Sequence, residues 1–250
     1  MAKCGAKPIL AILSSFVQRT YDQLSQDLCL NNSPASILIY WGALSSGDAT
    51  HLGSFDIPLM SNIPNLVYLA PTCKEEYLAM LDWSVEQNDY PVAIRVPFAQ
   101  FVSTGVEDKT DYSQLNKYKV EEEGSEVAII ALGSFFKLGK EVREYMKDKL
   151  GINATLINPK FITGIDEKLL ESLKDSHKLV ITLEDGMLDG GFGEKIARFY
   201  GNSDMKVLNF GGLKEFTDRV PLDELYQRYH LTKELITQDT AECLSLASVK

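Results

Sequence analysis

Short, predominantly apolar runs alternate with stretches of helical spacing along the whole chain, and this alternation constrains the fold more than any other feature. Apolar residues that follow one another without alternating polar ones indicate strands buried on both faces, as in parallel sheets flanked by helices. The pattern predicts an α/β protein with mainly parallel sheets flanked by helices. The runs lie at 8–13, 35–40, 66–70, 91–96, 126–132, 154–158, 178–183 and 206–210, with helical spacing at 17–30, 74–86, 138–149, 166–174 and 221–237.

A polar segment divides the chain into two regions of similar size. It is rich in acidic residues and contains Glu-Asp-Lys-Thr-Asp at 107–111. Charge-rich, turn-prone segments connect domains because few contacts cross there. We therefore predict two α/β domains, over residues 1–105 and 125–250, joined by a linker over 106–124.

Charge and cysteine content restrict the partners and the compartment. The formal net charge is −10, and no stretch gathers Lys and Arg, so neither nucleic acid nor an anionic membrane is expected as a partner. No run of about 18 apolar residues predicts a membrane span, and residues 1–8 are too polar for a signal peptide. The four cysteines lack disulfide or metal-ligand spacing, so we expect free thiols and a cytoplasmic location.

Several segments together resemble the 1-deoxy-D-xylulose-5-phosphate synthase family within the transketolase superfamily. The resemblance extends from Gly5 to about Ile236. It implies an N-terminally truncated pyrimidine-binding domain followed by a transketolase C-terminal domain. The segments that carry it are Ser-Ser-Phe-Val-Gln-Arg-Thr-Tyr-Asp-Gln at 14–23, Gly-Asp-Ala-Thr-His-Leu-Gly-Ser-Phe-Asp at 47–56, 63–71, 91–95, Gly133, 166–167, 182–184, Gly-Gly-Phe-Gly at 190–193 and the closing Asn-Phe-Gly-Gly-Leu that begins at 209.

Part of the family's pattern has no match in this chain. The Gly-Asp-Gly…Asn signature, which holds Mg²⁺ and the diphosphate of thiamine diphosphate, is missing, because Gly47-Asp48 is followed by Ala-Thr-His. The glutamate that activates the cofactor's aminopyrimidine is missing as well. The resemblance thus implies half of an active site, with thiamine diphosphate as the cofactor and Mg²⁺ held by the absent N-terminal domain. It implies a partner N-terminal transketolase-type domain or subunit, in a homodimer or heterotetramer, and small-molecule substrates.

Phe16 and Arg19 are the candidate cofactor-binding residues. Phe16 matches the family's aromatic residue that stacks on the cofactor's pyrimidine, although a Phe after a strand also fits an ordinary core position. Arg19 lies one helical turn further on and so on the same face. It matches an arginine beside the cofactor, with a surface salt bridge to Asp22 as the alternative.

His51 and Asp48 are the candidate catalytic residues. His51 lies in a polar loop between glycines, and an ordinary imidazole pKa near 6.5 suits proton transfer at neutral pH. Asp48 matches a family residue that binds substrate hydroxyls, while a turn-forming role after Gly47 is the alternative. A metal site built from Asp48, His51 and Asp56 lacks a fourth ligand, so no metal site is predicted within the chain.

The substrate-binding positions depart from the family's pattern. Leu13, Trp41 and Phe98 stand where the family carries a tyrosine and two arginines that hold the phosphate of the acceptor, whereas Arg95 keeps the first arginine of its run. Losing two guanidinium groups and a phenol removes the bidentate donors that a phosphate dianion needs. We therefore predict an altered acceptor.

Three functions remain open at this stage. The first is the C-terminal portion of a thiamine-diphosphate-dependent carboligase, a transferase of aldehyde or ketone residues that is inactive as an isolated chain. The second is the C-terminal subunit of a split transketolase. The third is a non-catalytic paralogue that binds a partner chain.

Overall fold

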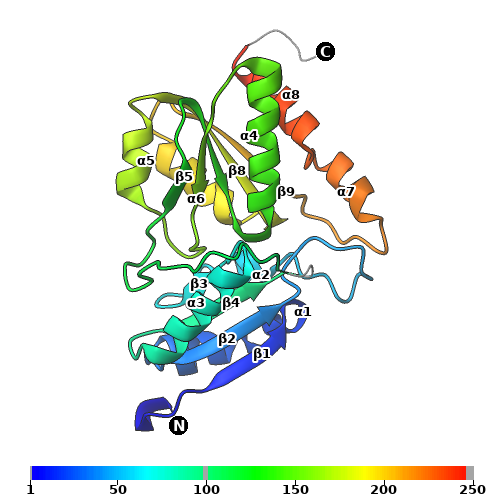
Figure 1. Ribbon diagram of the computed structural model, residues 1–250. Helices are drawn as coiled ribbons and strands as arrows, with labels where there is room; N and C mark the ends of the chain where they lie inside the picture. Colours follow the sequence, from blue (N-terminus) through cyan, green and yellow to red (C-terminus); the bar gives the residue numbers. More distant parts are fainter. Residues whose placement is uncertain (1, 98–100, 246–250) are drawn as a thin grey trace.

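The computed structural model describes residues 2–97 and 101–245, which form two sheets, one above the other (Figure 1). The lower sheet is parallel and has the strand order β1-β2-β4-β3. The upper sheet has the order β5-β7-β6-β8-β9, and within it only β5 is antiparallel to its neighbour. The predicted α/β class with mainly parallel sheets is confirmed. The strands are β1 (Ile9–Leu13), β2 (Ala35–Tyr40), β3 (Val67–Leu69), β4 (Pro91–Val96), β5 (Lys119–Glu122), β6 (Glu126–Ala131), β7 (Thr155–Asn158), β8 (His177–Met187) and β9 (Lys206–Gly212).

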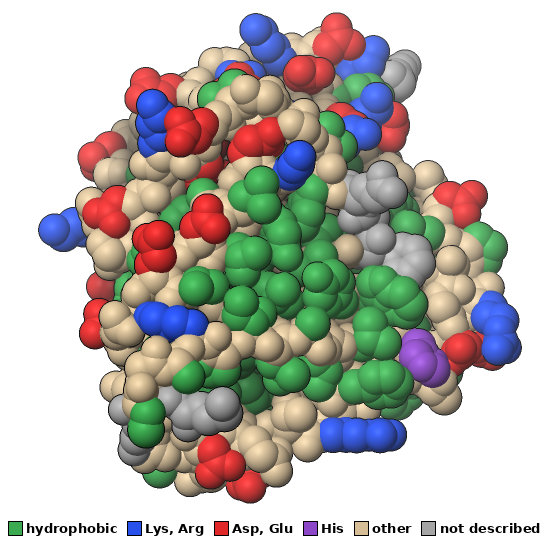
Figure 2. All heavy atoms as spheres, turned by 60° about the horizontal axis from the view of Figure 1, so that its bottom comes forward, with side chains coloured by type: hydrophobic (Ala, Val, Ile, Leu, Met, Phe, Trp, Pro, Cys, Tyr) green, Lys and Arg blue, Asp and Glu red, His purple; other side chains and the backbone are tan. Residues whose placement is uncertain are grey.

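Helices cover the two faces of the lower sheet unequally. One face, with Ile37 and Ile39, packs against a series of short helices. On the other face, Met80 of α3 is buried with Leu38 and Ile94. In the view from below, hydrophobic side chains gather over a broad area of the surface (Figure 2). The helices of this part are η1 (Ala2–Cys4), α1 (Ser14–Val17), η2 (Gln18–Thr20), η3 (Gln23–Cys29), α2 (Asp56–Met60) and α3 (Lys74–Glu86).

The single helix expected over 17–30 is irregular in the structure. A 3₁₀ turn (η2) is followed by a π-helix (η3), in which the Leu30 N–H donates to the Ser25 carbonyl at 2.9 Å. A π-helix brings residues five apart onto one face. Leu24 and Cys29 have this spacing, and both are buried in the core. The wider helix therefore lets both side chains pack against the sheet.

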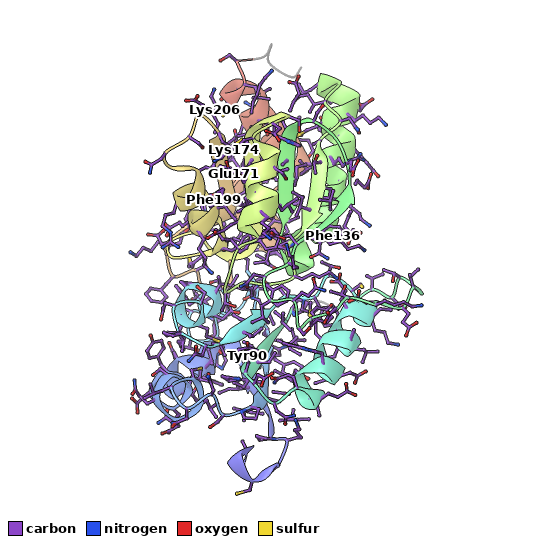
Figure 3. The ribbon with its side chains drawn as sticks, turned by 90° about the vertical axis from the view of Figure 1, so that its left-hand side faces the viewer. Tyr90, Phe136, Glu171, Lys174, Phe199 and Lys206 are labelled. Atoms are coloured by element: carbon purple, nitrogen blue, oxygen red, sulfur yellow. The ribbon has the colours of Figure 1, made fainter. Side chains whose placement is uncertain are left out.

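Helices flank both faces of the upper sheet. Buried residues of α4, α7 and α8 pack on one face, including Val142, Leu225 and Ile236. On the other face, Lys174 after α5 lies 5.5 Å from the ring of Phe199 on α6 (Figure 3). The described residues contain no helix that is long and apolar enough to span a membrane. The helices are η4 (Gly133–Phe135), α4 (Phe136–Leu150), α5 (Glu167–Leu173), α6 (Phe192–Tyr200), α7 (Leu222–Arg228) and α8 (Lys233–Cys243).

Hydrogen bonds and a buried ion pair join the two halves. The Ala70 N–H donates to the Lys160 carbonyl at 2.8 Å, and the Ile162 N–H donates to the Tyr68 carbonyl at 2.7 Å. The Lys160 ammonium is 1% exposed and lies 2.5 Å from the carboxylate of Glu76 on α3. The segment after β7 is therefore fixed against the lower sheet.

The segment expected to be a linker is partly ordered by packing. Tyr112 is buried beside Phe161, and Tyr118 is buried in the main core. Residues 119–122 form β5, which pairs with β7. The polar composition of residues 106–124 predicted an exposed linker throughout. In the structure, Tyr112, Tyr118 and β5 are packed against the rest of the protein, so the chain is exposed as predicted mainly before Tyr112.

We propose that the chain between the two domains is open to proteases only around Lys109, whose side chain is 82% exposed. Trypsin should therefore cut first after Lys109, because Tyr112 and β5 hold the chain that follows. Mass spectrometry of the first fragments checks this. A first cut within 119–122 or inside β6 would show that the proposed boundary is misplaced.

Candidate functional site

The carboxyl ends of the lower strands face the upper sheet and form a cavity with it. In parallel sheets, loops at this edge are where ligands bind. The loop after β2 supplies one wall, and η4, α7 and the end of β8 supply the other. The cavity has a volume of about 660 Å³. Its lining residues are Trp41, Ala43, Leu44, Ser45, Ser46, Gly47, Asp48, His51, Pro97, Ser134, Phe135, Asp185, Leu222 and Tyr226.

The loop after β2 is held by close contacts with the end of β1. The Ser14 hydroxyl donates to the Trp41 carbonyl at 2.9 Å. A Cβ atom on Gly53 would lie 1.7 Å from the same carbonyl, so only glycine fits at this position. Trp41 itself has a φ of 61°, in the left-handed region. These contacts fold residues 41–55 back over the start of α1.

His51, Asp48 and Thr50 form one hydrogen-bonded group in this loop. The His51 Nδ1 atom lies 3.3 Å from Asp48 Oδ1 and 2.8 Å from Thr50 Oγ1. Hydrogen bonds from Thr50, and then from His51, lower the pKa of Asp48 to about 2. Asp48 is therefore an anion at neutral pH. A His51 tautomer with its proton on Nδ1 would then leave Nε2 as a proton acceptor.

Phe16 and Arg19 lie against this group. The Phe16 and His51 rings are 5.4 Å apart in an edge-to-face arrangement. The Arg19 guanidinium lies 5.5 Å from the centre of the Phe16 ring. A second hollow of about 460 Å³, lined in part by Arg19 and Thr50, adjoins them. The structure thus brings the proposed cofactor-binding pair, Phe16 and Arg19, next to the proposed catalytic pair.

Arg95 is buried in an ion pair with Asp56 and is not among the residues that line the large cavity. Its side chain is 4% exposed, and its Nε and Nη2 atoms donate to the Asp56 carboxylate at 2.7 and 3.0 Å. Nη2 also donates to the Asp185 carbonyl at 2.7 Å, while the Tyr68 hydroxyl donates to Asp56. With its donors engaged beneath the cavity, Arg95 holds the His51 loop against β8.

The remaining substrate-binding candidates differ in their placement. Trp41 lines the cavity and is 42% exposed. Leu13 is partly buried at the end of β1 and lines neither the large cavity nor the hollow beside Arg19. Phe98 falls outside the described residues, although Pro97 just before it lines the cavity.

Sequence reasoning missed the wall that the upper sheet contributes. Asp185 is buried, and its carboxylate accepts hydrogen bonds from the Leu44 N–H at 2.8 Å and the Ser134 hydroxyl at 2.9 Å. Burial raises the pKa of Asp185. Its place two residues after the run 178–183, near the carboxyl end of a parallel strand, was the available signal. Phe135, Leu222 and Tyr226 gave no comparable signal.

Among the described residues, the cavity lining is mainly apolar and includes no Lys or Arg side chain. The ionisable side chains in this described lining are Asp48, His51, Asp185 and Tyr226. Within residues 2–97 and 101–245, no group of three or more His, Cys, Asp or Glu residues could hold a metal ion. The arrangement can therefore place a His51 nitrogen beside a substrate and enclose an apolar group, while its described lining residues include no guanidinium or ammonium group for an anion.

Comparisons with known proteins agree with the α/β fold described above. Residues 1–100 match the model of the transketolase pyrimidine-binding domain, and residues 116–236 match that of the transketolase C-terminal domain. The 1-deoxy-D-xylulose-5-phosphate synthase of Clostridium tetani is 34% identical over 98% of this chain, and that of Acidobacterium capsulatum is 33% identical over 98%. The chain spans 39% of the length of each of these relatives.

Solved structures show the same fold. A split-gene transketolase described as an inactive beta4 tetramer superimposes with a TM-score of 0.85 at 22% identity, covering 98% of this chain and 78% of that one. A transketolase mutant from Pichia stipitis superimposes with a TM-score of 0.74 at 14% identity, covering 97% of this chain and 35% of that one.

Proposed function

Because the chain belongs to the transketolase family, as a pyrimidine-binding domain followed by a C-terminal domain, we propose that it is the C-terminal portion of a thiamine-diphosphate-dependent carboligase similar to 1-deoxy-D-xylulose-5-phosphate synthase. The observation that carries the proposal is the ring contact of Phe16 with His51, which is hydrogen-bonded to Asp48 and lines the cavity together with it. A cytoplasmic location and turnover only with a partner domain or chain are part of the proposal.

Each residue of the group has a role in such an enzyme. Thiamine diphosphate, when bound, supplies a nucleophilic carbon and stores electrons. Phe16 would stack on its pyrimidine ring, and Arg19 would fix the orientation of Phe16 through the cation–π contact. His51 would accept or return a proton at a substrate oxygen, with Asp48 holding its Nδ1 side. Asp48 would also bind substrate hydroxyls.

The described residues fit only one end of the cofactor. An aromatic ring and an arginine suit the pyrimidine end, whereas the lining of the large cavity offers no cation and the described chain no metal-ligand cluster for a diphosphate. We propose that Mg²⁺ and the diphosphate are held by an N-terminal transketolase-type domain or subunit. This chain covers 39% of the length of the Clostridium tetani relative. The rest of that relative's length is enough for such a domain, which supports the proposal.

The isolated chain should therefore bind thiamine diphosphate weakly. Stacking on one aromatic ring contributes about 1–3 kcal/mol, which corresponds to a dissociation constant weaker than about 1 mM. Calorimetric titration of the chain with thiamine diphosphate and Mg²⁺ measures this constant. A micromolar or tighter value would contradict the assignment of the diphosphate site to a partner.

The acceptor is proposed to lack a phosphate group. The cavity wall beside His51 presents Trp41, Leu44 and Phe135, and its buried carboxylate is Asp185. A phosphate dianion there would meet like charge and apolar surface without a guanidinium donor. An aldehyde with an apolar substituent fits this lining better.

A second candidate is the C-terminal subunit of a split transketolase. The observation that favours it is the superposition with a split-gene transketolase chain over 98% of this chain. That structure is described as an inactive tetramer, which accords with a chain that needs a second gene product. Turnover of ketose phosphate donors, compared with turnover of pyruvate in the reconstituted enzyme, distinguishes a split transketolase from the synthase-like carboligase.

A further inference from the structure

A segment of the upper half reaches the loop after β2. It comprises residues 215–219, here called the strap, and lies between β9 and α7 (Figure 1). The Arg219 N–H donates to the Gly47 carbonyl at 2.9 Å. The Asp218 carboxylate accepts a hydrogen bond from the Ala49 N–H at 3.3 Å. The strap therefore binds the main chain of the loop on both sides of one residue.

That residue is Asp48, the hydrogen-bond partner of His51. Among the described residues, every other hydrogen bond made by residues 47–51 stays within the loop. The side chains of Asp48 and His51 are 36% and 43% exposed, so water competes for the hydrogen bond between them. The strap thus supplies the outside anchor for the main chain that carries this exposed pair.

The strap is held by contacts of its own. Glu215 lies 3.0 Å from the guanidinium of Arg228 on α7, a helix that lines the large cavity. The Phe216 ring lies against that of Phe55, with the ring centres 5.6 Å apart. Arg219 has a φ of 51°, a left-handed conformation that a non-glycine residue keeps where its surroundings hold it. These contacts fix the strap between α7 and the loop.

The upper half also holds both ends of the loop. The Leu44 N–H donates to the Asp185 carboxylate at 2.8 Å, and the Met187 N–H donates to the Ser54 carbonyl at 3.0 Å. Asp185 and Met187 belong to β8. Because the strap binds the loop between these two contacts, the upper half fixes the loop along most of its length.

We propose that the strap is a positioning element: through Asp218 and Arg219 it keeps Asp48 within reach of His51 and so sets the orientation of the His51 ring. This inference rests on the proposed function, from which His51 takes its chemical role. Neither strap residue lines the large cavity, so both act through the loop. The C-terminal domain thereby shapes the site through the loop as well as through the cavity wall.

Nuclear magnetic resonance of the isolated chain tests the positioning without any reaction. The sequence contains three histidines, so the ring signals of His51 can be assigned. They should show nuclear Overhauser contacts with the Phe16 ring, whose centre is 5.4 Å away. Asp218→Ala should weaken these contacts and speed exchange of the Ala49 amide by about twofold to tenfold, because the amide loses its acceptor. Asp218→Asn keeps an oxygen acceptor and should restore both.

Asp189→Ala is the matched control for the loss of an exposed, paired carboxylate. The Asp189 side chain is 55% exposed and lies 3.5 Å from Lys214, while that of Asp218 is 59% exposed and lies 3.5 Å from Arg219. Asp189 lies outside the lining of the large cavity. Its removal should leave the His51 contacts unchanged. Equal thermal unfolding of the variants and the wild-type chain shows that all of them are folded.

The same variants have a kinetic effect in a reconstituted enzyme. The second component is the part of the Clostridium tetani synthase that this chain does not match, made as a separate polypeptide. Asp218→Ala should lower kcat by about twofold to tenfold and leave KM for pyruvate unchanged, because a misplaced His51 impairs the reaction and not binding. Asp218→Asn should recover the wild-type kcat.

The outcomes separate this proposal from the proposed function. Unchanged His51 contacts and Ala49 exchange in Asp218→Ala would overturn the positioning role. So would an equal change in Asp189→Ala, a failure of Asp218→Asn to restore the contacts, or an unchanged kcat of Asp218→Ala in an active mixture. Loosened His51 contacts in Asp218→Ala, together with an inactive wild-type mixture, would support the strap and refute the proposed function.

Discussion

The reconstituted enzyme should react with an unphosphorylated aldehyde at least as well as with glyceraldehyde 3-phosphate. The part of the cavity lining that the structure describes contains no Lys or Arg, and Trp41 stands where the resembling family has one of its phosphate-binding arginines. Each charge-assisted hydrogen bond to a phosphate contributes about 1.5–3 kcal/mol. The absence of two such contacts would cost about 3–6 kcal/mol, or roughly a hundredfold to ten-thousandfold in kcat/KM.

Trp41→Arg should restore part of the preference for the phosphorylated aldehyde. One guanidinium would raise the ratio of the two kcat/KM values by about tenfold to a hundredfold. Leu78→Arg is the control, because Leu78 is 44% exposed, close to the 42% of Trp41, and lies on α3 outside the cavity lining. A strong wild-type preference for the phosphorylated aldehyde would show that other residues rebuild the phosphate site.

Arg95→Met should destabilise the fold by about 3–5 kcal/mol. Removing one partner of a buried ion pair leaves the other charge without compensation. The Asp56 carboxylate would keep the Tyr68 hydroxyl, but it would lose both guanidinium contacts in a fully buried place. The carbonyl of Asp185 would lose its donor as well. Urea unfolding measures the loss.

A surface pair provides the comparison for Arg95. Lys119 lies 2.9 Å from Glu121, and its side chain is 56% exposed. Exposed ion pairs contribute about 0–1 kcal/mol, so Lys119→Met should change the unfolding free energy little. A loss below about 1 kcal/mol for Arg95→Met would contradict the structural role given to this arginine.

The sequence predicted the sheets well because burial on both faces leaves a local signal. Runs such as 35–40 and 91–96 are apolar apart from Ser36 and Arg95, and the structure places β2 and β4 there with the same bounds. The irregular helix after β1 could not be predicted, because the choice of a π-helix depends on how Leu24 and Cys29 meet the sheet. Polar composition also concealed β5, whose ladder partner lies more than 30 residues later.

The site was predictable only in part. Motif resemblance pointed to Phe16 and His51, and their ring contact joins residues far apart in the chain. The buried pairing of Arg95 could not be predicted, because its partner, Asp56, is 39 positions earlier and nothing local in the sequence indicates the pair. The wall around Asp185 depends on how the two sheets stack, which no local pattern encodes.

Turnover of pyruvate with an aldehyde, measured with and without the missing part of the unit, tests the central claim most directly. The chain alone should show no thiamine-diphosphate-dependent turnover, and the mixture with the unmatched part of the Clostridium tetani synthase should show it. His51→Ala should lower kcat in that mixture by about a hundredfold to ten-thousandfold, because general acid–base catalysis contributes this much. Turnover by the chain alone, or a mixture that binds thiamine diphosphate and yet remains inactive, would contradict the account.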